Sequence, residues 1–166
     1  MSNSKRILVA VDGTAESGRA VAYVADMVRG SPDVHIGLLH LVLPPSMLEW
    51  GGSDDPATED RVSRERLKDY EELEQAAIAE GRTMLDRLKG ILSKHGADVA
   101  ELLVQFVEPL DLTHVGNHIL RTAAERDYLT VVVARHSFAG LKRWFRHHLG
   151  EELIRRANGL TICVVA

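Results

Sequence analysis

Two continuous apolar runs near the end of the chain constrain the fold more than any other feature. They are residues 129–134 (LTVVVA) and 161–165 (TICVV), and an amphipathic helical segment lies between them. Runs rich in β-branched residues are typical of strands whose two faces are both covered by helices. The end of the chain therefore predicts a strand–loop–helix–strand unit of a parallel sheet. The loop after the first of these strands would lie at the carboxyl edge of the sheet, where open α/β sheets bind ligands.

The rest of the chain alternates in the same way. Apolar runs bounded by glycine, proline and polar residues predict strands at 7–11, 34–42, 99–107, 129–134 and 161–165. Stripes of apolar residues at helical spacing predict helices at about 14–30, 58–95, 111–123 and between the last two strands. The stripe of the long helix is interpreted as core, with a pairing surface for a second subunit as the alternative, and consists of Leu67, Tyr70, Leu73, Ala77, Gly81, Leu85, Leu88 and Leu92. Five strands alternating with four helices predict an α/β fold, a doubly wound parallel sheet of the flavodoxin type. These patterns alone leave the order of the strands open.

Length and composition limit the class of protein. A chain of 166 residues favours one domain over residues 1–166. No apolar stretch approaches 18 residues and the N-terminus shows no secretory pattern, so we expect no membrane span and a cytoplasmic location. The net charge of −4 argues against nucleic acid as a partner. Cys163 is the single cysteine, which excludes an internal disulfide and predicts a buried structural thiol.

The turn after the first predicted strand is the first candidate for function. Asp12-Gly13-Thr14 follows the strand directly, and Thr14 is a good N-cap for the helix that comes next. Asp12 has two interpretations: it caps the turn, or it accepts hydrogen bonds from a ligand's hydroxyl or amine. His40, near the end of the second strand, is interpreted as a satisfied residue of the core or rim rather than a ligand contact.

Two histidines raise the question of a metal. His114 and His118 lie four residues apart on a predicted helix and would share one face. No Glu follows His114 as in the metalloprotease pattern and no third ligand is evident, so we expect exposed histidines and no metal site. The sequence also shows no nucleophile–base pair, which argues against an enzyme. A weak hydrolase that uses His136, His147 or His148 remains as an alternative.

Several stretches together resemble the universal stress protein family. They are residues 7–14 (ILVAVDGT), 38–42 (LLHLV), 140–143 (GLKR), 151–157 (EELIRRA) and the closing strand. The resemblance covers nearly the whole chain, with residues 46–66, an acidic loop and the start of the long helix, as its variable region. It implies the strand order 3-2-1-4-5, a role in regulation or stress response, and a homodimer paired through the C-terminal strand. A protein partner for the dimer is a further expectation.

Nucleotide-binding members of that family carry a signature of Gly, two residues, Gly, nine residues, Gly, then Ser or Thr. Its glycines let the backbone approach phosphates. Alignment through GLKR places Ala134, Ser137, His147 and His148 at the four signature positions, and all four depart from it. The resemblance therefore implies a member that does not bind ATP tightly.

The alternative is an ATP- or AMP-binding switch, with the nucleotide between the ends of strands one and four. Asp12 matches the family's residue near the ribose and adenine, and Leu41 matches the position whose backbone contacts adenine. Basic side chains would then replace the missing amide contacts. The candidate nucleotide-binding residues are Asp12, Gly13, Thr14, Leu41, Val133, Ala134, Arg135, His136, Ser137, His147 and His148.

Overall fold

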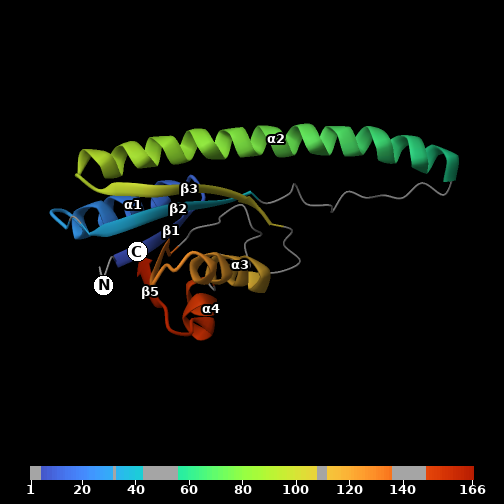
Figure 1. Ribbon diagram of the computed structural model, residues 1–166. Helices are drawn as coiled ribbons and strands as arrows, with labels where there is room; N and C mark the ends of the chain where they lie inside the picture. Colours follow the sequence, from blue (N-terminus) through green and yellow to red (C-terminus); the bar gives the residue numbers. More distant parts are fainter. Residues whose placement is uncertain (1–4, 32, 43–55, 108–111, 136–148) are drawn as a thin grey trace.

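The computed structural model describes residues 5–31, 33–42, 56–107, 112–135 and 149–166. Its strands are β1 (Lys5–Val11), β2 (Val34–Val42), β3 (Asp98–Phe106), β4 (Thr130–Ala134) and β5 (Thr161–Val165). Its helices are α1 (Ala15–Met27), α2 (Pro56–Lys94), α3 (Leu112–Glu125) and α4 (Leu149–Arg156). The strands form one parallel sheet in the order β3-β2-β1-β4-β5 (Figure 1). The predicted α/β class and the strand order implied by the resemblance are both confirmed.

The central strand β1 shows why helices cover both faces of the sheet. Successive side chains of a strand point to opposite faces, and every residue from Ile7 to Val11 is buried. Ile7, Val9 and Val11 pack in a core with α1 and α2, whereas Leu8 and Ala10 pack in a second core with α3 and α4. Figure 1 shows α2 on one side of the sheet and α3 and α4 on the other. Each large side chain buried in this way contributes about 2 kcal/mol.

The pairing register brings the predicted site residues to one edge of the sheet. Ala10 of β1 is registered with Leu39 of β2 on one side and with Val133 of β4 on the other. Asp12 therefore leaves the sheet at the level of Leu41 and Arg135. The direction of the strand order reverses between β1 and β4, so this is the topological switch point at which doubly wound sheets bind ligands.

Helix α2 is much longer than the sheet is tall. Its 39 residues span about 58 Å, and its N-terminal part extends well beyond the sheet in Figure 1. The predicted apolar stripe forms core in the second half of the helix, where Leu85, Leu88 and Leu92 are buried. The core assignment was wrong for Leu73, which is 55% exposed because the helix has no sheet beneath it there. The helix starts at Pro56. Residues 46–55 of the acidic loop predicted before it lie outside the described residues.

The terminal strand β5 pairs only with β4 among the described strands. Its outer edge therefore suits the strand pairing that the resemblance implies, although the homodimer itself stays a prediction. Cys163 lies in β5 and is half-buried rather than buried, because an edge strand is covered less completely than a central one. No helix among the described residues is long and apolar enough to cross a membrane.

Candidate functional site

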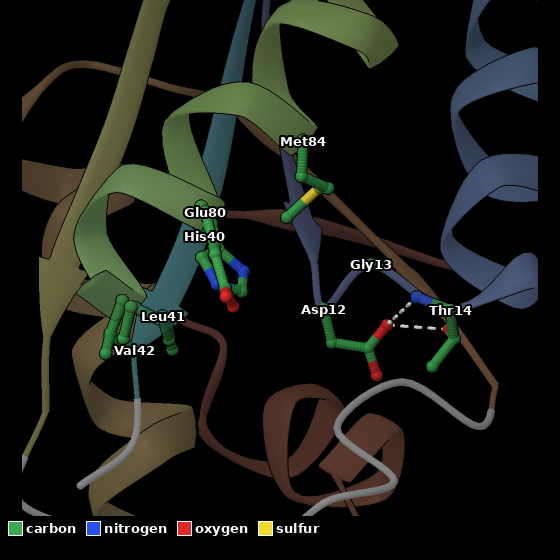
Figure 2. A pocket seen from close by; sticks show the side chains of 10 residues that line it. Asp12, Gly13, Thr14, His40, Leu41, Val42, Glu80 and Met84 are labelled. Atoms are coloured by element: carbon green, nitrogen blue, oxygen red, sulfur yellow. Dashed lines mark hydrogen bonds between the residues drawn. The ribbon is translucent and has the colours of Figure 1, made fainter. Parts of the chain in front are cut away.

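A pocket of about 360 Å³ opens at the carboxyl edge of the sheet, beside the switch point. Three elements form it: the turn after β1, the end of β2, and the middle of α2 (Figure 2). Its lining residues are Asp12, Gly13, Thr14, His40, Leu41, Val42, Ala77, Glu80, Gly81 and Met84. Four of the predicted site residues, Asp12, Gly13, Thr14 and Leu41, therefore share one cavity.

Hydrogen bonds fix the turn after β1. The Oδ1 atom of Asp12 accepts hydrogen bonds from the Thr14 amide at 3.1 Å and the Thr14 hydroxyl at 2.6 Å (Figure 2). It also accepts one from the Ser17 hydroxyl at 2.5 Å. Gly13 has a φ of 81°, a left-handed conformation that glycine adopts without strain. Thr14 caps α1 by accepting a hydrogen bond from the Ser17 amide at 3.3 Å. The capping role of Asp12 is confirmed, and contact with a ligand stays a prediction.

His40 is held in one orientation between β1 and α2. Its Nδ1 atom lies 3.0 Å from the carbonyl oxygen of Val11. A carbonyl can only accept, so Nδ1 carries the proton and donates. The ring packs against Gly81 of α2 so closely that a Cβ at Gly81 would lie 2.6 Å from the ring's Cδ2 atom. His40 is thus satisfied, as predicted, but it also lines the pocket.

Three predicted site residues lie in β4 or directly after it. The side chain of Val133 is buried in the core with α3 and α4, and that of Ala134 in the core with α1 and α2. Arg135 is exposed, and its backbone amide donates a hydrogen bond to the Val165 carbonyl at 2.7 Å. None of the three lines the pocket. The other four predicted residues, His136, Ser137, His147 and His148, lie outside the described residues.

The sequence reasoning missed the wall that α2 contributes. Ala77 and Gly81 of the apolar stripe line the pocket together with Glu80 and Met84, which no sequence pattern marks. More than 60 residues separate them from Asp12, and nothing in the helical spacing tells which turn of α2 packs beside β2. A glycine inside a helix is the one signal present, because it often marks a close approach by another element.

The structure corrects the prediction for His118. Its Nε2 atom lies 2.6 Å from Oε1 of Gln105, and its Nδ1 atom lies 3.1 Å from the Arg121 guanidinium. His118 is half-buried, and this burial, with the charge of Arg121 next, lowers its pKa, so the ring is neutral near pH 7. The expectation of two exposed histidines was therefore wrong for His118. The His114 side chain lies outside those described, and no group of metal-binding side chains occurs among the described residues.

Fold and pocket together define a doubly wound α/β protein with a cavity beside the switch point. The sequence matches the model of the universal stress protein family over residues 3–164, so the chain belongs to this family. No curated protein sequence matches the chain significantly.

Solved structures share the fold. The hypothetical protein MJ0577, whose biochemical function was assigned from its structure, matches with a TM-score of 0.68 and 18% identity over 98% of this chain and 95% of that one. A universal stress protein in complex with cAMP matches with a TM-score of 0.58 and 14% identity, covering 98% and 96%. A family member from Arabidopsis thaliana with AMP bound matches with a TM-score of 0.57 and 14% identity, covering 97% and 90%. At these identities the likeness shows the fold alone.

Proposed function

We propose that this chain is a regulatory protein of the stress response that does not bind ATP tightly. The observation that carries the proposal is the charge of the pocket. Among its described lining residues none is Lys or Arg, whereas Asp12 and Glu80 are acidic. A triphosphate brings several negative charges of its own, and like charges repel most strongly where water is partly excluded.

The signature positions support the same conclusion. A phosphate held by backbone amides needs glycines that leave the backbone accessible. This chain has Ala134 and Ser137 at the first two positions, and His147 and His148 at the last two. The imidazole of His147 would occupy space that a glycine leaves to the phosphate oxygens, and the loss of close backbone approach is hard to replace.

Calorimetric titration of ATP tests the proposal. The protein is first stripped of nucleotide, and mass spectrometry checks whether any copurifies. We expect no binding heat up to millimolar ATP. Micromolar binding would refute the proposal, and it would mean that basic side chains of the segment from Arg135 to His148 replace the missing glycines.

An AMP-binding switch is the second candidate. The pocket offers apolar walls at Leu41, Val42 and Met84 that suit a planar base, and two structures of similar fold hold cAMP or AMP. In this case we expect micromolar affinity for AMP that falls at least tenfold in Asp12→Ala. Asp12→Asn is the matched control, because its amide oxygen can keep the bonds from Thr14 and Ser17 that position the turn. Unchanged affinity in Asp12→Ala would exclude this site.

We further propose a homodimer formed through β5. The edge of β5 is unpaired among the described strands, and its Val164 is 38% exposed. Light scattering at tens of micromolar protein should give twice the chain mass of 18.4 kDa. A monomer mass would refute the dimer. Val164→Lys, a charge on the pairing strand, should shift the population toward monomer.

A further inference from the structure

The acidic wall of the pocket comes from α2 and has no counter-ion among the described residues. Glu80 lines the cavity, its side chain is exposed, and it forms no salt bridge with the described residues. Every charged residue from Asp69 to Glu80 is acidic, and Arg82, the next charged residue of the helix, lines a different cavity beside β3. Any ligand that enters the pocket therefore meets a carboxylate that no described residue neutralises, opposite the turn after β1 (Figure 2).

The side chains that line the pocket also present acceptors rather than donors. The Nδ1–H of His40 is used by the Val11 carbonyl, so in the neutral ring only Nε2, an acceptor, is left for a ligand. The hydroxyl hydrogen of Thr14 is used by Asp12 at 2.6 Å. The carboxylate of Glu80 can only accept. Acceptors pair with hydroxyl and amine hydrogens and not with phosphate oxygens, which are acceptors themselves.

From these two observations we propose that the pocket binds an uncharged nucleoside in preference to its phosphorylated forms, and that Glu80 sets this preference. The proposal rests on the proposed function, since both follow from the acidic lining of the pocket at the end of β1, and it goes further by naming the ligand class. Apolar walls at Leu41, Val42 and Met84 would hold the base. Glu80 and His40 would accept hydrogen bonds from the sugar hydroxyls or an amino group, while a phosphate would be repelled.

Calorimetric titrations of adenosine, AMP and ATP into three proteins test this proposal: wild type, Glu80→Gln and Glu72→Gln. Glu72 is an exposed acid two turns away on the same helix and does not line the pocket, so it controls for a general change of charge. We expect wild type to bind adenosine most tightly. Glu80→Gln should raise the affinity for AMP relative to that for adenosine about threefold, because it removes the repulsion of the phosphate and keeps an oxygen that accepts from adenosine, and this relative gain should shrink as salt rises. Glu72→Gln should match wild type.

Three results would overturn the proposal. The first is AMP binding by wild type at least as tight as adenosine binding. The second is an equal gain for AMP in Glu80→Gln and Glu72→Gln. The third is no adenosine binding at millimolar concentration, which would leave the absence of tight ATP binding intact. Micromolar ATP binding by wild type would instead overturn both this proposal and the proposed function, so the two failures can be told apart.

Discussion

Polar side chains gather at both ends of the parallel sheet, and the two groups differ in what surrounds them. At the amino end the hydroxyl of the buried Tyr128 donates to Oε2 of Glu101 at 3.0 Å, and Arg126 donates to the same oxygen at 3.2 Å. The Arg6 guanidinium lies 4.9 Å from the centre of the Tyr128 ring and donates to the Arg126 carbonyl at 3.1 Å. These four residues, the amino-end cluster, are partners of one another, and Arg126 also lines a cavity of about 430 Å³ beside β3.

At the carboxyl end the polar groups line one pocket together, and two of them have atoms without a partner among the described residues. Asp12 and Thr14 hold their own turn together, but His40 and Glu80 keep acceptor atoms that no described residue uses. This difference separates polar residues that stabilise the fold from polar residues that can bind a ligand. Where every partner is supplied by the chain, the cluster stabilises the fold, and where partners are missing beside a cavity, a ligand can supply them.

The largest effect is expected at Gly37, which lies under the amino-end cluster. A Cβ at this position would lie 2.1 Å from the Tyr128 hydroxyl oxygen and 2.6 Å from the ring. Gly37→Ala should therefore lower the free energy of unfolding by about 3 kcal/mol, because a fixed, buried ring cannot move aside. Chemical denaturation measures the change. Gly18→Ala, where the added carbon meets nothing within 4 Å, is the control and should not destabilise.

Tyr128→Phe should have the next largest effect. It removes the hydroxyl that donates to Glu101 and should cost about 1.5 kcal/mol, as for other bonds to charged groups. If the cost were near zero, the cluster would not be the stabilising unit described above.

The stability of the protein at alkaline pH tests the same hydroxyl without a mutation. Burial, and then the hydrogen bond to Glu101, raises the pKa of Tyr128 to about 12 from its ordinary value of 10. Between these values the unfolded chain has lost the proton and the folded chain keeps it, so this group's stabilisation is complete below pH 10 and is lost as pH rises toward 12. From pH 9 to pH 11, the free energy of unfolding should fall more in wild type than in Tyr128→Phe. Equal falls would contradict the shift.

The smallest effect on stability is expected at Gly81, beside the pocket. Its added Cβ would press on His40, whose ring is anchored to Val11, so Gly81→Ala should destabilise by about 1 kcal/mol. Gly90→Ala, on the same helix with open space around it, should stabilise by about 0.5 to 1 kcal/mol, since alanine favours helix. Adenosine affinity should fall only in the Gly81 variant. A fall in both variants would point to a change in the helix and not in the pocket.

The sequence predicted the fold well because each strand carries its own signal. The strands at 34–42 and 161–165 have the predicted bounds, and the order β3-β2-β1-β4-β5 follows from the family resemblance. The turn Asp12-Gly13-Thr14 was predicted for the same reason, since its residues are adjacent in the chain. Local patterns of this kind need no knowledge of distant partners.

Contacts between distant elements were not predictable. Glu80 reaches the pocket because of how α2 packs on the sheet, and helical spacing does not fix that packing. The partial burial of His118 was not predictable from its own helix, because its partner Gln105 is on β3, a different element. The amino-end cluster was missed for the same reason, since Tyr128 and Glu101 lie 27 residues apart.

The contrast between the two ends of the sheet can be tested most directly by mapping adenosine binding with amide chemical shifts. We predict that the amide signals of Gly13, Thr14 and Gly81 shift as adenosine is added, while those of Gly37 and Glu101 stay in place. Shifts at Gly37 and Glu101 with none at Gly13 and Gly81 would contradict it, because the ligand would then bind at the end of the sheet whose polar groups are already satisfied.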